Sequence, residues 1–594
     1  MAEPQRAGRA LYVLTILAGS FLLFLVQPMV ARIALPRLGG APAVWNSAML
    51  VYQALLLAGY GYAHALDRLP VRRQAAVHLG LLAIASLWLP IGVLGWRLPS
   101  GTAPELWVPW LLAASIGPLF VAVSAQAPLI QRWFAAARPG QDPYRLYAAS
   151  NLGSFAGLLA YPLLVEPLVS VAGQRWLWTG GYLLLIALVA AIAWRLPNAA
   201  VQRAEPVADD SPPSWRRIAM WVALALVPSG LMLATSTYIT TDIVAMPLQA
   251  LWRRGRGIPA LAVVGAICAL LLMLREWGPA AWFGEDSPGL IFAVIAVVGL
   301  ASIGVRAAYV TVLAVSLLLF GGINALRITA AGDIRTRSYF GVYTLSEDAN
   351  ERTLAHGTTL HGVQLLGSPE REQQPTTYYT PSSGVGRALT IAPALYGPEG
   401  RIGVVGLGTG TLACYALPTQ YWTFFEIDPV VAELARTRFS FLRTCTPDAQ
   451  TVIGDARVSI AAARPQSFDL LALDAFSSDA VPIHLLTREA FADYGRALQP
   501  KGLLLVHISN RYMDLTPIVA AAARAGGWQA IELMDRPPLN EDGASLSHWI
   551  ALSRDPGVID ALKGYGTGWV AIDQAGAGAG WTDDYASILP LLHP

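Results

Sequence analysis

The chain has 594 residues, of which 55% are hydrophobic and only 13% are charged. This length exceeds one ordinary hydrophobic core, and so low a charge content excludes a typical soluble protein. The net charge of +2 conceals two unlike halves, because residues 1–330 sum to +10 and residues 331–594 to −8. An acidic second half disfavours a nucleic-acid partner and is compatible with a cationic substrate.

Apolar stretches long enough to cross a bilayer recur through the first half of the chain. The first six are near residues 10–34, 43–66, 74–96, 107–133, 146–168 and 176–194. After a polar linker at 196–214, four less regular stretches follow near 217–236, 258–274, 288–304 and 307–326. Residues 1–330 therefore predict an α-helical multi-pass membrane domain of about eight to ten helices, with the lipid bilayer as a partner.

Arginine placement predicts the orientation of this domain. The N-terminus and the second and fourth loops are richest in arginine, at Arg6, Arg9, Arg68, Arg72, Arg73, Arg132, Arg138 and Arg145. Because positive loops stay in the cytoplasm, the N-terminus is expected inside, and an even number of helices leaves the C-terminal half there too. Asn151 and Glu166, polar residues within or beside predicted spans, leave a transport role open.

Cysteine is scarce in the chain. Cys268, Cys414 and Cys445 show neither the spacing of a zinc site nor a disulfide framework. We expect the last two to be ordinary thiols of a reducing compartment, and we expect no metal.

The soluble half begins with short alternating segments, so residues 331–384 predict a small β domain. Residues 401–405 then read as a buried strand, and the turn Gly406-Leu407-Gly408-Thr409-Gly410 leads into a helix. The next strand ends at Glu426, 20 residues after Gly406. Glycines allow close backbone approach to a nucleotide, and an acid at this distance accepts hydrogen bonds from ribose hydroxyls. Residues 385–594 therefore predict an α/β Rossmann-like domain of the methyltransferase type.

Two further strands end in acids, at Asp455 and Asp474. Ligands of open α/β sheets bind outside the carboxyl ends of the strands. Glu426, Asp455 and Asp474 are therefore expected to converge on one crevice.

The soluble half resembles the spermidine synthase (polyamine aminopropyltransferase) family over about residues 335–560. More narrowly, the whole chain resembles bacterial proteins that fuse a multi-pass membrane region to such a domain. The resemblance is carried by the stretches 354–364, 378–379, 406–410, 426–428, 454–456, 474–482 and 484–487.

The resemblance implies roles for individual residues. The adenosyl cofactor is expected to contact Gln364, Gly406, Gly408, Thr409, Gly410, Glu426, Ile427, Asp455 and Ala456. The catalytic set is expected to be Asp474, Asp479, Tyr378 and Tyr379, with Asp474 accepting the proton of the attacking amine and residues 477–482 forming a gate. Among the histidines, His484 is the best functional candidate, while His356, His361, His507 and His548 are expected to be structural. The segment 581–585 reads either as a cover over the site or as a terminal turn.

The expected reaction is aminopropyl transfer from decarboxylated S-adenosylmethionine to a diamine such as putrescine, giving spermidine and methylthioadenosine. One departure keeps alternatives open, because Thr409 stands where the family has an aspartate that binds the amine of the decarboxylated cofactor. Full S-adenosylmethionine and a methyltransferase or lyase reaction remain alternatives, as does a polyamine transporter or sensor. The expected location is the bacterial inner membrane, with a cytoplasmic catalytic domain and homodimerisation left open.

Overall fold

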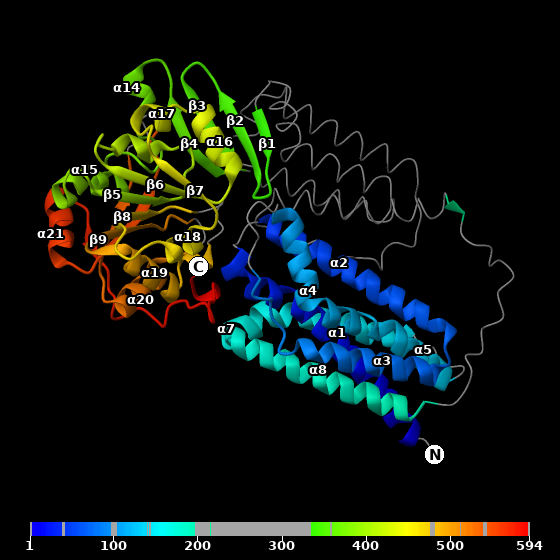
Figure 1. Ribbon diagram of the computed structural model, residues 1–594. Coiled ribbons are helices and arrows are strands. Elements are labelled where there is room, and N and C mark those ends of the chain that lie inside the picture. Colours follow the sequence, from blue (N-terminus) through cyan, green and yellow to red (C-terminus); the bar gives the residue numbers. More distant parts are fainter. Residues whose placement is uncertain are drawn as a thin grey trace, which may run out of the picture. The chain divides into compact units, whose positions relative to one another are not determined.

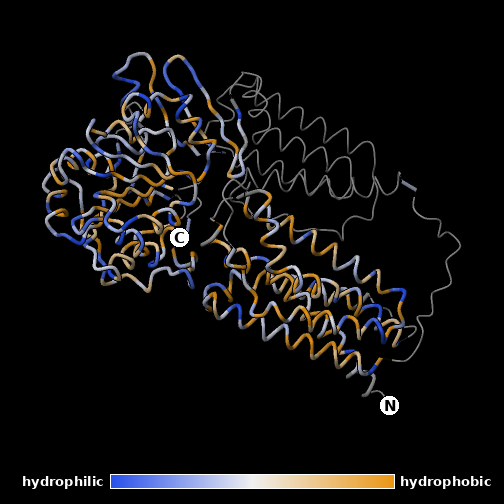
Figure 2. The backbone as a smooth tube through the Cα atoms, viewed as in Figure 1, coloured by the Kyte–Doolittle hydropathy of each residue, from blue (hydrophilic) through white to orange (hydrophobic). Residues whose placement is uncertain are grey.

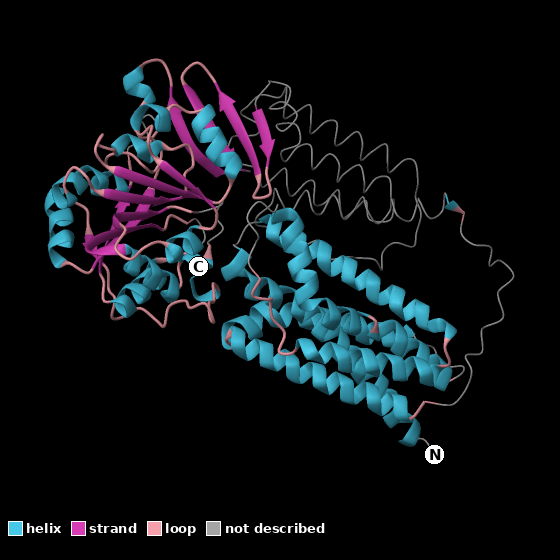
Figure 3. Cartoon of the chain, in the orientation of Figure 1, coloured by secondary structure: helices cyan, strands magenta, loops and turns pink. Residues whose placement is uncertain are grey.

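A computed structural model describes residues 3–38, 42–96, 104–138, 141, 144–196, 214–215, 334–356, 359–475, 482–510, 513–537 and 543–591. Its N-terminal part is helical and its C-terminal part combines helices with two sheets (Figure 3). The predicted spans at 217–236, 258–274, 288–304 and 307–326 lie outside the described residues.

The N-terminal part consists of helices that follow the predicted spans. They are α1 (Glu3–Leu38), α2 (Pro42–Ala65), α3 (Val71–Ala85), α4 (Pro104–Ser124), α5 (Gln126–Ala137), α6 (Tyr144–Ala160), α7 (Glu166–Leu168) and α8 (Val171–Trp194). A short 3₁₀ helix η1 (Leu66–Arg68) joins α2 to α3, a second one η2 (Ser86–Trp88) follows α3, and a π-helical turn η3 (Tyr161–Val165) joins α6 to α7. The structure divides the stretch at 107–133 between α4 and α5, and it ends the helix of the stretch at 74–96 at Ala85.

Within the described residues, four helical segments are long and apolar enough to cross a membrane. They are Gly8–Leu35, Leu106–Ala137, Leu146–Leu168 and Val171–Trp194. Apolar residues cover much of this part of the chain (Figure 2). Large side chains such as Leu57, Leu168 and Trp194 are more than 70% exposed, an arrangement that water disfavours and lipid tolerates.

The C-terminal part begins with a four-stranded sheet in the order β1-β2-β3-β4. Its strands are β1 (Ile334–Arg337), β2 (Val342–Glu347), β3 (Glu351–His356) and β4 (Thr359–Leu365). Strands β3 and β4 pair antiparallel. This sheet matches the small β domain expected from the alternating sequence.

A second sheet of eight strands has the order β12-β10-β11-β9-β8-β5-β6-β7 (Figure 1). Its strands are β5 (Arg401–Val405), β6 (Tyr421–Glu426), β7 (Gln450–Ile453), β8 (Phe468–Leu473), β9 (Leu498–His507), β10 (Gln529–Asp535), β11 (Ser547–Ser553) and β12 (Val570–Ala571). The five strands from β7 to β9 run parallel, whereas β11 is antiparallel to both of its neighbours. This order confirms the predicted Rossmann-like fold.

Helices cover both faces of the large sheet, and each face has its own core. Helices α18 (Ala456–Ala462), α19 (Arg488–Ala497) and α20 (Thr516–Gly526) pack on one face. The other face carries α15 (Gly384–Tyr396), α16 (Pro429–Thr437), α17 (Phe441–Cys445) and α21 (Pro556–Tyr565). Because both faces are covered, β5 and β8 are almost entirely apolar and buried.

Side-chain caps start several of these helices just after a strand. Asp428 caps α16 through the backbone N–H of Val430, and Asp455 caps α18 through that of Val458. A carboxylate there satisfies an N–H group that the first helical turn leaves unpaired. The caps place both acids at the carboxyl ends of β6 and β7, where a ligand is expected.

The structure corrects the expectation of two free thiols. Cys414, in the turn η7 (Thr411–Tyr415), forms a disulfide with Cys445 at the end of α17. The two residues are 31 apart in sequence, and sequence spacing alone does not reveal such a pair. The bond joins the segment that follows the glycine turn to α17.

Candidate active site

The glycine turn lies at the carboxyl end of β5, in the middle of the parallel strands. Gly406, Gly408 and Gly410 have φ of +92°, +53° and +88°, a region that side chains with a Cβ rarely adopt. A Cβ on Gly406 would also lie 2.0 Å from the carbonyl oxygen of Asp474. Only glycine therefore allows β5 to end this close to the residue that follows β8.

Glu426 lies at the end of β6 and is buried against this turn. Its two carboxylate oxygens accept backbone N–H groups, from Leu407 at 3.0 Å and from Asp428 at 2.9 Å. Burial raises the pKa of the Glu426 carboxyl to about 7, although these backbone groups act to lower it. The acid predicted to bind ribose is thus fixed beside the glycine turn and titrates near neutrality.

Thr409 is enclosed within the protein. Its hydroxyl bonds that of Thr411 at 2.8 Å, and the side chain is 1% exposed. It lies against Gly362, where a Cβ would approach the Thr409 Oγ1 to 2.4 Å. The position where the family has an aspartate is therefore neutral and packed against β4.

The side-chain amide of Gln364, at the end of β4, forms all its observed hydrogen bonds with other protein groups. Its Nε2 donates to the Glu372 carbonyl oxygen at 2.9 Å and to the Ser440 hydroxyl, while its Oε1 accepts the backbone N–H of Ser440 at 3.2 Å. The side chain is fully buried. It ties β4 to the start of α17, and its predicted contact with the cofactor tail stays a prediction.

Asp474 follows β8 directly and is 5% exposed. Its Oδ2 accepts a hydrogen bond from the Tyr379 hydroxyl, and its Oδ1 lies 2.7 Å from the His507 Nδ1. Burial, and next the negative charge of Asp474, raise the pKa of the Tyr379 hydroxyl well above its usual value, so that hydroxyl remains a donor. Each carboxylate oxygen keeps a second lone pair for a further donor.

Asp455 pairs with the histidine of the predicted gate. Its Oδ2 lies 2.9 Å from the His484 Nε2, and its Oδ1 accepts the backbone N–H of Val458. Burial acts to raise the pKa of the Asp455 carboxyl, but the hydrogen bond and charge of His484 outweigh it, and the net pKa is lowered. An ionised carboxylate therefore anchors η8 (Ile483–Leu485) beside the end of β7.

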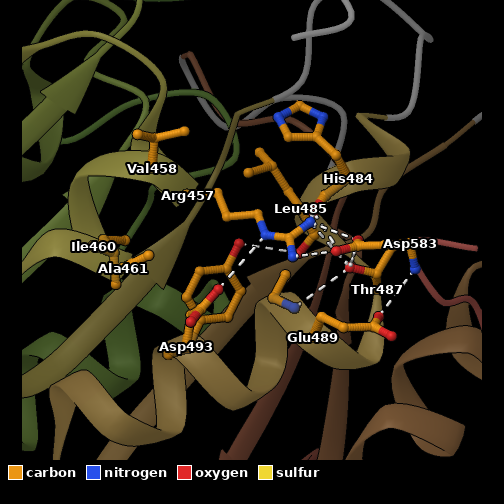
Figure 4. Close-up of polar contacts among 12 residues, drawn as sticks. Arg457, Val458, Ile460, Ala461, His484, Leu485, Thr487, Glu489, Asp493 and Asp583 are labelled. Atoms are coloured by element: carbon orange, nitrogen blue, oxygen red, sulfur yellow. Dashed lines mark hydrogen bonds and ion pairs between the residues drawn. The ribbon is translucent and has the colours of Figure 1, made fainter. Parts of the chain in front are cut away.

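Arg457, in the first turn of α18, joins this region to the C-terminal segment (Figure 4). Its guanidinium donates to both carboxylate oxygens of Asp583, at 2.7 and 2.6 Å, and to the His484 carbonyl oxygen at 3.0 Å. Thr487 donates to the same carboxylate at 2.9 Å. The segment 581–585, left open between a cover and a terminal turn, is thus bound to α18 by a two-pronged ion pair.

Several of the predicted site residues fall into three groups: those that contact one another, those that lie next to a predicted acid, and those outside the described residues. The structure places Tyr379 directly on Asp474, and it places the glycine turn directly on Glu426. Ile427 is half-buried and Ala456 is buried, each next to a predicted acid. Asp479 and the gate residues 477–481 lie outside the described residues.

Two histidines that were expected from the sequence to be structural lie beside predicted site residues. His507 forms a hydrogen bond with Asp474. His361 lies in β4, and its carbonyl oxygen would be 2.9 Å from a Cβ on Gly408. Burial lowers the pKa of His361 to about 4, and its Nε2 has no hydrogen-bond partner in the described part of the chain. A histidine at the last position of a buried strand was the available signal for His507.

Comparison with known proteins finds a relative for part of the chain. No family model matches the chain. The polyamine aminopropyltransferase of Vibrio vulnificus is 34% identical over 125 residues, which are 20% of this chain and 41% of that protein. Part of this chain is therefore related to the polyamine aminopropyltransferases. The match spans less than half of the relative's length.

Solved structures match parts of the chain at low identity and low TM-score. A probable spermidine synthase from Corynebacterium glutamicum is 19% identical, with a TM-score of 0.33, and covers 42% of this chain and 95% of its own. The spermidine synthase of Thermotoga maritima is 15% identical, with a TM-score of 0.29, and covers 38% of this chain and 74% of its own.

Proposed function

We propose that the C-terminal domain is an aminopropyltransferase. It transfers the aminopropyl group of decarboxylated S-adenosylmethionine to a diamine such as putrescine, giving spermidine and methylthioadenosine. The observation that carries this proposal is Asp474, a buried carboxylate beside the glycine turn whose two oxygens are oriented by Tyr379 and His507. The relationship to a polyamine aminopropyltransferase supports it.

The chemistry requires such a carboxylate. The amine nitrogen attacks the carbon next to the sulfonium, a carbon–nitrogen bond forms, and the carbon–sulfur bond breaks with its electron pair going to sulfur. A free alkylamine has a pKa around 10 and is protonated at pH 7. Asp474 holds the amine, accepts its proton and aims its lone pair at the carbon, while Glu426 holds the ribose.

A second candidate rests on Thr409. Because this position offers no carboxylate, the site lacks the family group that binds the amine of the decarboxylated cofactor and that would repel the carboxylate of full S-adenosylmethionine. A methyltransferase or a lyase acting on the full cofactor would use the same glycine turn and the same Glu426. We rank it second because Asp474 retains the position of a base beside the reacting carbon.

The first half gives the enzyme its location in this proposal. Four apolar helical segments are compatible with membrane insertion, and we propose that residues 1–330 hold the enzyme in the bacterial inner membrane with its catalytic domain in the cytoplasm. The diamine is the small-molecule partner and the bilayer is the other.

Product analysis separates the candidates. The full chain, purified in detergent, is incubated with S-adenosylmethionine or its decarboxylated form, with and without putrescine, and products are identified by mass spectrometry. We expect spermidine and methylthioadenosine only with the decarboxylated cofactor and putrescine. Adenosylhomocysteine would indicate methyl transfer, methylthioadenosine without amine would indicate a lyase, and binding without turnover would indicate a sensor or transporter.

Replacement of Asp474 tests the assigned base. We expect Asp474→Asn to lower kcat by about 10²- to 10⁴-fold, the usual contribution of a general base, because the amide cannot accept the amine's proton. Calorimetry should show that methylthioadenosine still binds, since Glu426 and the glycine turn are unchanged. Activity near that of the unmodified protein would remove Asp474 from the mechanism.

A further inference from the structure

His507 and Asp474 are adjacent because of strand register. Strands β8 and β9 are parallel neighbours (Figure 1), and Leu473 pairs with Val506. The next residue along each strand is Asp474 and His507 respectively, so the sheet itself brings the two side chains together. Both are buried, with side-chain exposures of 5% and 7%.

The hydrogen bonds around His507 run in one direction, toward Asp474. The backbone N–H of His548 donates to the Ser509 Oγ at 2.8 Å, and that hydroxyl lies 2.7 Å from the His507 Nε2. A serine hydroxyl that already accepts this bond can donate its own proton to Nε2. This arrangement assigns the ring proton to Nδ1, which then donates to the Asp474 Oδ1 at 2.7 Å.

Two aromatic rings fix the imidazole plane. Tyr378 stacks on it with centroids 4.9 Å apart and planes at 21°, and Trp549 does so at 4.6 Å and 19°. Trp549 is fully buried, and its Nε1 donates to the Tyr378 carbonyl oxygen at 3.4 Å. The ring therefore has little freedom to turn away from the carboxylate, and the donor at Nδ1 is preorganised.

We propose that His507 is a positioning residue for the catalytic carboxylate. It fixes the orientation of Asp474, so that the free lone pairs of the carboxylate face the attacking amine. This role rests on the proposed function of Asp474 and extends it to the chain Ser509–His507–Asp474–Tyr379. His507 acts through Asp474, and Tyr379 bonds the second carboxylate oxygen.

The physical reason is desolvation. Burying a carboxylate disfavours its charged form unless donors replace the lost water. Tyr379 supplies one donor and His507 supplies the other. Without the donor at Oδ1, a buried carboxylate oxygen would be left unsatisfied, and the carboxylate could rotate away from the direction in which it receives the amine.

The test compares His507→Gln with His507→Leu. The glutamine amide can still donate to Asp474, whereas leucine fills the space without a donor. We expect His507→Leu to lower kcat by about ten- to a hundredfold, the worth of one hydrogen bond to a charged group. The KM for the decarboxylated cofactor should stay within about threefold, and His507→Gln should recover at least half of the lost activity on a logarithmic scale.

A matched control comes from the same sheet. His548 pairs with Glu532 through Nε2 at 2.8 Å, so His548→Leu removes the donor of a similar histidine–carboxylate pair on β11. We expect its kcat to match that of the unmodified protein. Equal melting temperatures for His507→Leu and His507→Gln would exclude unfolding as the cause of any difference between them.

Infrared difference spectroscopy tests the inference without turnover. The carboxylate stretching band of Asp474, identified by its loss in Asp474→Asn, should shift in His507→Leu, because Oδ1 loses its donor. Failure of the unmodified protein to form spermidine would reject the proposed function while leaving this measurement decisive. The positioning role is overturned if the band does not shift, or if His507→Gln and His507→Leu lose the same activity.

Discussion

At the residue scale, Glu426 combines deep burial with a proposed role in binding ribose. Its oxygens are held by the backbone N–H groups of Leu407 and Asp428. Burial raises the pKa of its carboxyl to about 7. Below that pH the carboxyl is protonated, and only above it are both oxygens free of a proton and able to accept ribose hydroxyls. Cofactor affinity should therefore rise with pH through neutrality.

This dependence can be measured with methylthioadenosine, whose ribose is present but which carries no charge. We expect its Kd to fall by about fivefold between pH 6 and pH 7, by about tenfold between pH 6 and pH 8, and to level off above pH 8, following proton linkage. Glu426→Gln should bind more weakly and show a flat profile, because an amide does not titrate. Glu532→Gln on β10 is the control and should keep the slope. A flat profile in the unmodified protein would contradict the assignment.

The same shift has a consequence for stability, with the opposite sign. The folded protein binds a proton at Glu426 between the usual carboxyl range and about pH 7, whereas the unfolded chain does not. Stability of the ligand-free protein should accordingly decline as pH rises across that window and then stop changing. A cofactor in the site is expected to offset this decline, since ribose hydroxyls favour the ionised form.

At the element scale, Arg457 holds the C-terminal segment against α18 (Figure 4). The guanidinium is 11% exposed and the Asp583 side chain 35% exposed, with Asp493 at 3.6 Å as a second acid. The charge and hydrogen bonds of Arg457 outweigh burial and lower the pKa of the Asp583 carboxyl. The segment is therefore fixed by an ionised and largely desolvated pair.

Removal of Arg457 should loosen this segment. We expect Arg457→Met to lower the free energy of unfolding by about 1–3 kcal/mol, because Asp583 loses its partner but is exposed enough for water to compensate in part. Urea unfolding of the full chain in detergent, followed by tryptophan fluorescence, measures the change. The control is Lys501→Met, since Lys501 is 80% exposed and 4.0 Å from Asp555. A comparable loss in both variants would argue against a specific role for the pair.

The glycine turn is supported on one side by neighbouring elements and by the disulfide. Gly410 packs against α17, where its Cβ would lie 3.1 Å from the Leu442 Cγ, and Cys445 of α17 is bonded to Cys414. Ser440, directly before α17, holds Gln364. Elements from β4, η7 and α17 thus support one side of the turn, so that its three glycines keep their left-handed conformation.

At the scale of the whole molecule, the prediction concerns topology. The basic loops predict that the N-terminus is inside, and an even number of crossings would return the chain to the cytoplasm. We expect a green fluorescent protein fused after Pro594 to fluoresce in bacterial cells and an alkaline phosphatase fused there to be inactive. The loop after Arg37 follows the first predicted span and should lie outside. Fusions there should give the reverse pattern, with no fluorescence and an active phosphatase. An active phosphatase at the C-terminus would show an odd number of crossings.

The sequence by itself determined that the first half is helical and apolar, that the second half has a Rossmann-like fold, and where most of the candidate site residues lie. Apolar stretches of spanning length, the glycine turn and acids at successive strand ends are local signals, because each depends on residues close together in the chain. They located Glu426 beside the turn and Asp474 at the end of β8, and the sheet order bears out the Rossmann-like fold. These local signals did not predict that the stretch at 107–133 divides into α4 and α5.

Only the tertiary structure decided which distant side chains meet. His507 is 33 residues from Asp474, Asp583 is 126 from Arg457, and Cys414 is 31 from Cys445. Each pair depends on strand register or on a segment that returns to the site from far along the chain. The sequence around a single histidine, aspartate or cysteine does not identify its partner. Hydropathy indicates which solvent surrounds a segment, and glycine spacing indicates the local backbone conformation. The environment of the proposed catalytic carboxylate, Asp474, is instead set by contacts that form only when the sheet is assembled.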